Sequence, residues 1–526
     1  MRRWPLRFER AAPLALWAAA MVMVLLGLAT TALIADIPER GVPLIREPAH
    51  TGASAPTVMV GLPFGPLNLQ PRNDPSGQRG SGGRARAHYA GGKPATSPAI
   101  TRRAPDARLF YVDHEFGFEP TLGVNRDGTV FYVAVKSPLR TVVMRSRDDG
   151  ASWGDVSPQT HRTTQDPYLW IDKGTGRLFV VDFAAGLQVS FSDDEGESWT
   201  SSTVPFSWHT DHQNLFAGPP PTGGTEPLGY PHVVYLCSIG GGALGGLGTA
   251  TTCSRSLDGG ISFVLTGEAP FVDGMNEEVG HFGVRGHCGG ETGHGFVDRR
   301  GDVYLARGWC SQPWLAVSRD EGASWRRVQV ADNGMPGPRS DGVQEHEAGV
   351  VVDDEGNVYV VWTARNRLPY LAISRDGGKS FGTPMMIGPP GLREASLPSI
   401  DIGDTGKIAI AYIGSTNAPG GRAPTGEGPE YEQVTWNGYV TITTQALSGN
   451  PVFYTASINK PREPLVKGEC PIIRCQQQFD FIDVVVGPDG TAWTSMVDGC
   501  IDAQCRELGL AILGHLVGGP TLGSNY

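Results

Sequence analysis

One short phrase limits the fold of this chain more than any other feature. It reads Ser-x-Asp-x-Gly-x-Ser followed by Trp or Phe, and its five copies begin at Ser146, Ser192, Ser256, Ser318 and Ser374. Asp and Ser oxygens accept hydrogen bonds from nearby backbone amides, Gly permits a positive φ, and the closing aromatic packs under the turn. Apolar or β-branched runs precede the copies, so each phrase is expected to be a structural turn between two strands. The structural positions are Asp148, Trp153, Asp194, Trp199, Asp258, Phe263, Asp320, Trp325, Asp376 and Phe381.

The spacing of the phrase predicts how many units the fold repeats. Successive copies are separated by 46, 64, 62 and 56 residues, a mean of 57, and residues 106–526 hold about seven such units. An apolar run, an Asp/Gly turn and a second apolar run also recur seven times, at residues 120–135, 167–183, 213–236, 293–306, 348–362, 398–412 and 481–496. These patterns predict an all-β propeller of seven, alternatively six, four-stranded blades. Each hairpin supplies the two inner strands of a blade, the phrase joins the two outer ones, and the last two blades lack it.

The phrase is the Asp box, and the chain resembles the β-propellers of the sialidase superfamily, also called BNR-repeat proteins. The resemblance runs from about residue 107 to the C-terminus. It implies a propeller architecture. It says less about activity, because Asp boxes also occur in propellers that hydrolyse other glycans and in propellers that have no hydrolase activity. Sialidases themselves have six blades. Residues 107–112 are expected either to pair with the final blade and close the ring or to begin the first blade.

The N-terminal residues predict export. Arg2, Arg3, Arg7 and Arg10 precede an uncharged run of 24 residues, 11–34, which is long enough to cross a bilayer as a helix. Basic residues on the N-terminal side place the remainder of the chain outside the cytoplasm. Residues 1–36 are therefore expected to be a signal anchor or a cleaved signal peptide. The propeller is then either anchored in the cell envelope or secreted.

The segment after the predicted anchor has the composition of a linker. Residues 37–105 hold 11 prolines and 10 glycines and no sustained apolar period, which is typical of a disordered stalk. The predicted organisation is thus residues 1–36 as anchor, residues 37–105 as linker and residues 106–526 as propeller.

Charge divides the chain into two parts and limits its partners. Residues 1–105 sum to +8, so residues 106–526 carry −19 of a chain whose net charge is −11. An acidic domain repels phosphate backbones, which argues against nucleic acid and is compatible with cations or with neutral or basic ligands. The same acidity also keeps an exported domain soluble. We expect a monomer whose partner is a glycan or another envelope component.

The eight cysteines all lie in the predicted propeller. An even number in an exported chain predicts disulfides, whereas the Cys-x4-Cys spacing is wider than that of common zinc sites. Local bridges are expected from Cys237 to Cys253 and from Cys288 to Cys310. The pairing of the last four stays open between local and crossed bridges: Cys470, Cys475, Cys500 and Cys505.

Acidic residues recur where the innermost strand begins in six of the seven predicted blades. This position holds Glu119, Asp166, Asp211 with His212, Glu291 with His294, His346 with Glu347, Ser396, and Asp480 with Asp483. In a propeller these positions meet around the central channel. They can bind a cation, with Ca²⁺ favoured by oxygen ligands, or supply an acid pair for glycoside hydrolysis. Alternatively, they hydrogen-bond neighbouring strands and tie blades together.

The resemblance implies a more detailed site for a true sialidase. That family binds the substrate carboxylate with three arginines, uses a Tyr nucleophile activated by a Glu, and employs an Asp as acid/base. The first arginine lies in an Arg-Ile-Pro segment, where this chain has Phe116-Gly117-Phe118-Glu119-Pro120. An acid thus replaces the expected positive charge, which weakens the case for sialidase chemistry. The other candidates lie near blade mouths but match no family motif. They are Arg285, Arg307, Arg339 and Arg393 as a clamp for a carboxylate, and Tyr168 and Tyr412 as the nucleophile.

The sequence therefore predicts a propeller that binds or hydrolyses glycans; as an enzyme it would be a glycoside hydrolase of exo-sialidase type. The candidate catalytic residues are Glu291, Glu347 and Asp166. The candidate ligand-binding residues are Glu119, Asp211, His212, His346, Asp480, Asp483, Arg285 and Arg339. The alternative is a non-catalytic scaffold that recruits a protein partner or a metal ion.

Overall fold

The computed structural model describes most of the C-terminal four fifths of the chain. Side chains are described for residues 106–523, outside the gaps, and the backbone alone for residues 57–60, 240, 275–281 and 284–287. The gaps are residues 113–116, 137–138, 160–163, 165, 184–185, 206, 208–209, 241–249, 272–274, 282–283, 288–291, 310–311, 333–347, 421–425, 461, 471–480 and 501–508.

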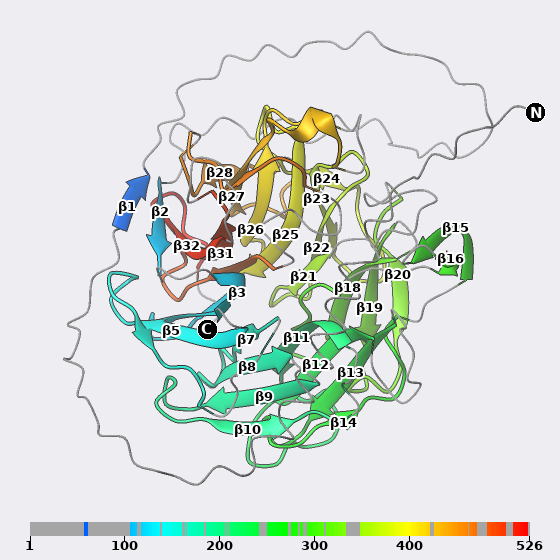
Figure 1. Ribbon diagram of the computed structural model, residues 1–526. Helices are drawn as coiled ribbons and strands as arrows, with labels where there is room; N and C mark the ends of the chain where they lie inside the picture. The colour runs from blue at the N-terminus through cyan, green and yellow to red at the C-terminus, as the bar shows by residue number, and fades with distance from the viewer. Residues whose placement is uncertain are drawn as a thin grey trace, which may run out of the picture. The chain divides into compact units, whose positions relative to one another are not determined.

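Seven antiparallel sheets of at least four strands form a propeller, which confirms seven blades rather than six (Figure 1). Blade 1 is β3 (Gly117–Val124), β4 (Val130–Lys136), β5 (Arg140–Ser146) and β6 (Gly154–Asp155). Blade 2 is β7 (Tyr168–Ile171), β8 (Leu178–Phe183), β9 (Leu187–Ser192) and β10 (Thr200–Thr203). Blade 3 is β11 (Thr210–Gly218), β12 (Val233–Gly240), β13 (Thr251–Ser256) and β14 (Val264–Leu265).

The remaining blades follow the same strand order. Blade 4 is β17 (Phe296–Val297), β18 (Val303–Trp309), β19 (Gln312–Ser318) and β20 (Arg326–Gln329). Blade 5 is β21 (Gly349–Val352), β22 (Val358–Thr363), β23 (Pro369–Ser374) and β24 (Met385–Met386). Blade 6 is β25 (Glu394–Ile402), β26 (Ile408–Ser415), β27 (Thr435–Thr443) and β28 (Tyr454–Ser457), with β29 (Val466–Lys467) also paired to β27. Blade 7 is β30 (Asp483–Val486), β31 (Ala492–Asp498), β32 (Leu510–Val517) and β2 (Asp106–Tyr111).

Four short elements of the described residues lie outside this pattern. Strand β1 (Thr57–Val60), within the predicted stalk, pairs with β2, and β15 (Met275–His281) pairs with β16 (Val284–His287). One 3₁₀ turn, η1, spans Pro429–Tyr431. In the described part of the chain, no helix has the length and apolar character needed to span a bilayer. The predicted anchor at residues 11–34 lies outside the described residues.

The ring is closed by a strand from the beginning of the propeller. Strand β2 pairs antiparallel with β32 from Asp106 opposite Val517 to Tyr111 opposite Ile512. Phe110 is buried and stacks on Trp493 of β31 at 5.7 Å between ring centroids. Of the two expectations for residues 107–112, closure of the ring is therefore confirmed. Closure pairs the last blade with the first strand of the propeller, so the first and last blades are joined by backbone hydrogen bonds.

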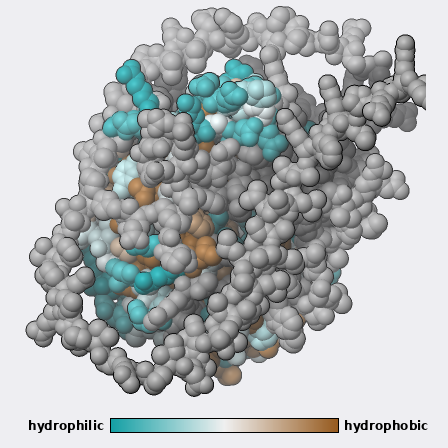
Figure 2. Space-filling view, viewed as in Figure 1, coloured by the Kyte–Doolittle hydropathy of each residue, from teal (hydrophilic) through white to brown (hydrophobic). Residues whose placement is uncertain are grey.

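The core lies between the faces of neighbouring blades. Each innermost strand contacts the innermost strand of the next blade, and β30 contacts β3. Glycine makes two of these approaches close: a Cβ on Gly123 would lie 2.6 Å from Ile171 of blade 2, and one on Gly218 would lie 2.5 Å from Val297 of blade 4. Apolar side chains therefore fill the space between blades. On the face shown in Figure 2, the coloured surface is mostly hydrophilic, with a smaller hydrophobic area.

The five repeated phrases adopt one turn geometry between the third and fourth strands of blades 1 to 5. In blade 1, the Ser146 hydroxyl donates to Asp148 and accepts from the Gly150 amide at 2.9 Å each, while Asp148 accepts from the Ser152 amide at 2.8 Å. Gly150 has φ of 83°. The other four copies repeat these three bonds. The phrase is thus a turn, as predicted.

One predicted disulfide is confirmed. Cys237 of β12 and Cys253 of β13 lie opposite each other and are bonded. Cys470 and Cys500 each take part in a disulfide as well. Cys288, Cys310, Cys475 and Cys505 lie outside the described residues, so the predicted bridge from Cys288 to Cys310 stays a prediction.

The turn geometry predicts unequal roles for its two serines. In blade 4, Ser318 is buried and its hydroxyl is the acceptor for the Gly322 amide at 2.8 Å. Ser318→Ala leaves that buried amide without its acceptor and is expected to lower the free energy of unfolding by about 1–3 kcal/mol. Ser324→Ala, the exposed control in the same turn, is expected to cost less than about 0.5 kcal/mol. Denaturant unfolding of both variants measures the difference; equal losses would contradict it.

Candidate functional site

The structure describes five of the eleven candidate site residues with their side chains. Glu119, Asp166, Asp211, His212 and Asp483 are among the described residues. Arg285 lies on β16, where the backbone alone is described. The others lie outside the described residues, so their roles stay predictions: Glu291, Glu347, His346, Asp480 and Arg339.

Glu119 ties two blades together. It is buried on β3 at a β-bulge between Phe118 and Thr121, with φ of 56°. Its carboxylate accepts the backbone N–H of Phe481, which precedes β30, at 3.0 Å. Glu119 thus links blade 1 to blade 7. This is the alternative in which acids at the strand starts hydrogen-bond neighbouring blades.

His212 occupies a similar backbone position on β11. It lies at a bulge between Asp211 and Asn214, has φ of 46°, and is buried with its ring 5.2 Å from that of Phe481. Strand β25 has a third bulge of this kind at Leu397, with φ of 54°. Bulges turn side chains out of the regular alternation of a strand. Here they bring Glu119 and His212 together at Phe481.

The other two acids at the strand starts make local contacts. The backbone carbonyl of Asp166 accepts a hydrogen bond from the side chain of Gln213, which joins blades 2 and 3. Asp211 is exposed, and its carboxylate accepts the His212 amide at 2.9 Å.

A cavity of about 490 Å³ lies in the central channel, toward the end where the innermost strands finish. We call it the turn-side cavity. The innermost strands of all seven blades contribute to its walls, and so do the turns that follow β7, β17 and β21. Its apolar and aromatic walls include Tyr168, Phe216, Phe296, Val350, Ile400 and Val484. Of the five described candidate residues, Asp483 alone is among those that line this cavity.

Aromatic and imidazole rings from four blades meet at one end of this cavity. His294 and Tyr168, which both line the cavity, make an edge-on contact at 5.3 Å. Behind Tyr168, the buried Phe481 ring lies 6.3 Å away and also contacts His212. Phe481 thus contacts a ring of the cavity wall, while its backbone N–H is bound by Glu119.

Asp483 is a buried carboxylate surrounded by donors. It accepts from the Val484 amide at 2.8 Å, the Leu122 amide at 3.3 Å and the Ser399 hydroxyl at 3.3 Å. Its Oδ1 also lies 3.5 Å from Nδ1 of His294. Burial raises the pKa of Asp483 to about 6, because loss of hydration outweighs the charge of His294 and the amide hydrogen bonds, and nearby Asp401 raises it further.

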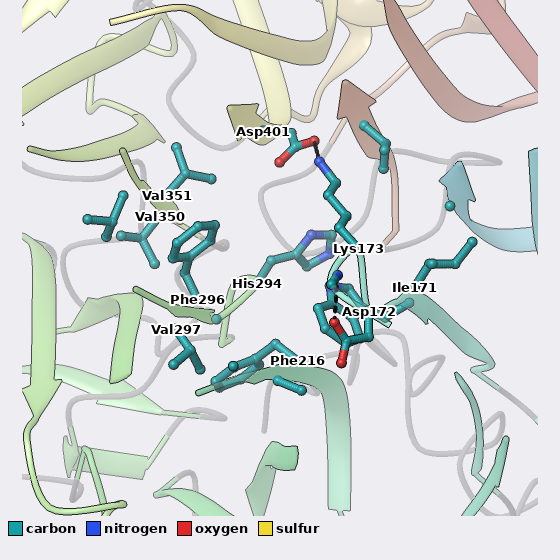
Figure 3. Close-up of a pocket in the computed structure, with 18 of the residues that line it drawn as sticks. Ile171, Asp172, Lys173, Phe216, His294, Phe296, Val297, Val350, Val351 and Asp401 are labelled. Carbon is teal, nitrogen blue, oxygen red and sulfur yellow. Dashed lines mark hydrogen bonds and ion pairs between the residues drawn. The ribbon is translucent and has the colours of Figure 1, made fainter. Parts of the chain in front are cut away.

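An ion pair crosses the channel beside Asp483. Lys173, which follows β7 in blade 2, donates to Asp401 of β25 in blade 6 at 2.9 Å, and Figure 3 shows its side chain extended toward that carboxylate. The same Asp401 oxygen accepts the Val486 amide at 2.7 Å. Lys173 and Asp401 are both partly exposed and both line the cavity.

A second histidine–aspartate pair lines the same cavity. His232 Nδ1 lies 2.6 Å from Asp172, which also accepts from the Tyr230 hydroxyl at 2.5 Å and the Gly174 amide at 2.9 Å. Burial alone would raise the pKa of Asp172, but the hydrogen bonds from His232, Tyr230 and Gly174 outweigh it and lower that pKa. Asp172 therefore stays ionised and holds His232 in place.

The cationic side chains of the described cavity walls are already paired. Lys173 pairs with Asp401, and Arg299 pairs with Asp354. Two arginines considered for a carboxylate clamp have other contacts: Arg307 is buried and donates to Thr251 at 3.0 Å, and Arg393 donates to the Pro419 carbonyl. Tyr412 is buried in the core and bonded to Thr441 at 3.0 Å. The described walls thus offer no unpaired Lys or Arg for a substrate carboxylate.

Sequence reasoning missed most of this cavity. Asp172, Asp298 and Asp353 each begin the turn after an innermost strand, and this recurring Asp/Gly turn was a signal that could have identified them. No comparable signal marks Lys173, Asp401 or His232. Among the described side chains, no group of three or more His, Cys, Asp or Glu is placed to hold a metal ion.

Comparisons with known proteins give similarity of shape only. No family model matches the chain, and no curated protein matches it. Among solved structures, the BP39L lectin from Burkholderia pseudomallei matches at 10% identity and TM-score 0.48 over 78% of this chain and 99% of that chain. A Dyadobacter fermentans protein of unknown function matches at 12% identity and TM-score 0.41, over 78% of this chain and 98% of that chain. The K499G mutant of the NanB sialidase from Streptococcus pneumoniae matches at 11% identity and TM-score 0.39, over 80% of this chain and 70% of that chain. At these values the matches carry no activity over to this chain.

The environment of Asp483 predicts a pH-dependent contribution to stability. Its folded pKa of about 6 exceeds the ordinary 3.8, so this contribution is complete below about pH 4 and is lost as the pH rises through about 6. Between about pH 7.5 and 4.5, the wild type should gain about 2 kcal/mol in unfolding free energy relative to Asp483→Asn. Unfolding of both proteins across this range provides the measurement. A difference that does not change with pH would show that Asp483 titrates normally.

Proposed function

We propose that this protein binds a small glycan in the turn-side cavity. The observation that carries the proposal is that one cavity combines carboxylates with aromatic walls. Asp401 and Asp483 offer oxygens to sugar hydroxyls, and Tyr168, Phe216 and Phe296 offer faces for the apolar C–H side of a sugar ring. The volume of about 490 Å³ falls within the usual range for small-ligand sites.

The charges of the cavity favour a neutral glycan over an acidic one. Lys173 and Arg299 are each held by an aspartate, and carboxylates outnumber these cations among the described wall residues. A sialic acid would bring a carboxylate that meets like charges. We therefore propose a neutral sugar, in place of the sialoside that the Asp-box resemblance implies.

Membership of the Asp-box propellers is also our proposal. The common hydrogen bonds of the five turns support it, and the same bonds in a crystal structure would test it. Hydrolysis at the strand starts by Glu291, Glu347 and Asp166 stays a prediction from the sequence. So does the alternative of a scaffold for a protein partner or a metal ion such as Ca²⁺.

We further propose that the propeller is exported and held at the cell envelope by residues 1–36. The apolar run at 11–34 and the disulfide between Cys237 and Cys253 support this, because such bridges persist in oxidising compartments. A reporter enzyme that is active only outside the cytoplasm, fused after residue 526, should be active. Replacing Leu25 and Leu26 by Arg in the apolar run should abolish that activity. Activity that survives the replacement would contradict the proposal.

Glycan binding is tested directly with the full chain. A glycan array followed by calorimetry should identify a neutral ligand. Asp401→Asn should weaken its binding roughly 10- to 100-fold, because a hydrogen bond to a charged group is lost. Asp404→Asn is the matched control: this exposed carboxylate lies in the turn of the same hairpin, pairs with Lys407, and should leave the affinity unchanged. Absence of binding to every glycan would remove the proposal.

A further inference from the structure

Two carboxylates in the cavity are placed by the same strand. The Val484 amide donates to Asp483 at 2.8 Å, and the Val486 amide donates to Asp401 at 2.7 Å. Strand β30 is innermost in blade 7 and pairs only with β31 within the described sheet, so its other edge faces the channel. Amides two residues apart in a strand point the same way and lie about 7 Å apart. Each carboxylate therefore has one oxygen anchored at an amide of the same strand edge, and the two anchoring amides are about 7 Å apart.

This spacing corresponds to a known arrangement of acid pairs. In glycoside hydrolases that invert the anomeric centre, the two carboxyl groups are about 6.5–9.5 Å apart, which leaves room for a water molecule beside the sugar. In retaining enzymes the separation is about 5–5.5 Å. The spacing of the two anchoring amides of β30 is nearer to the inverting separation than to the retaining one.

The two carboxylates have different surroundings. Asp483 is buried, with its side chain 7% exposed, beside His294. Asp401 is 15% exposed and is paired with the ammonium of Lys173. Burial favours the protonated form of a carboxyl group, whereas a neighbouring cation favours the ionised form. The environments therefore assign the acid to Asp483 and the base to Asp401.

We propose that the turn-side cavity hydrolyses a neutral glycoside with inversion, with Asp483 as general acid and Asp401 as general base. This inference rests on the glycan binding proposed above and assigns a reaction to the same site. The cavity volume of about 490 Å³ points to short glycans or chain ends as substrates.

The reaction uses water and needs no other reactant. Asp483 gives its proton to the glycosidic oxygen as the bond from that oxygen to the anomeric carbon breaks. A water molecule on the opposite face of the ring forms the new bond to this carbon, and its proton passes to Asp401. The products are a sugar hemiacetal of inverted configuration and an alcohol. Proton exchange with solvent then restores both carboxyl groups.

His294 contributes to the same site as a positioning residue. Its Nδ1 faces Asp483, and its buried Nε2 has no hydrogen-bond partner among the described residues. Figure 3 shows the ring in the middle of the pocket, between Phe296 and Lys173. In this position the ring fixes the Asp483 side chain through Nδ1.

The test uses the purified full chain and a panel of neutral and sialylated 4-nitrophenyl glycosides, with binding and release measured in parallel. Neutral glycosides should be cleaved and sialosides should not. Asp483→Asn and Asp401→Asn should each lower kcat roughly 10²- to 10⁴-fold, since each removes proton transfer. Asp489→Asn, an exposed carboxylate in the turn after β30, is the control and should keep full activity. A cooperative melting transition for each variant would show that it folds.

Two measurements on the wild type do not depend on the folding of variants. Proton NMR of the first-formed sugar should show inversion; retention would overturn the assignment. The kcat should fall as the pH rises through about 6, because Asp483 then loses its proton in the field of His294, Asp401 and Lys173. Binding of neutral glycosides without cleavage would overturn the proposed hydrolysis and leave the proposed glycan binding intact. Absence of binding would remove both.

Discussion

The pairing of β2 with β32 is the constraint on which the rest of the structure depends. It joins the first strand of the propeller to its last blade, and β30 then contacts β3. Without β2, the outer edge of β32 in blade 7 would be left unpaired. Closure also fixes the channel, because seven innermost strands can surround one axis only when the ring is complete. Every contact across the channel, such as that of Lys173 with Asp401, follows from it.

The channel has two parts that differ in physical character. At the strand starts, the Glu119 carboxylate accepts a hydrogen bond from the Phe481 amide, and His212 packs against the Phe481 ring. Polar groups there satisfy the backbone of neighbouring blades, as buried groups must. Toward the turns, the open edge of β30 presents amides to Asp401 and Asp483, whose side chains line the cavity. A carboxylate that ties two blades together and one that lines the cavity thus differ in which amide each of them meets.

Several features of the fold could be predicted from particular residues. The Ser-x-Asp-x-Gly phrases identified the outer turns, because their hydrogen bonds are made within eight residues of one another. The seven apolar hairpins identified the inner strands for the same reason. The site was harder to predict. The bulges at Glu119 and His212 leave no mark in the sequence, yet they decide where these side chains point. Of the acids predicted to face the channel, Asp483 is the one that the described cavity uses.

The sequence by itself determined the local structure: the turns, the hairpins, the number of blades and the pairing of Cys237 with Cys253. These rest on contacts between residues close in the chain, or on a period repeated along it. The tertiary structure alone decided which side chains share the cavity. Lys173 and Asp401 are more than 200 residues apart, and the ion pair between them exists because ring closure brings blades 2 and 6 to opposite sides of one channel. Such a meeting depends on the sum of all blade packings, which no short segment encodes.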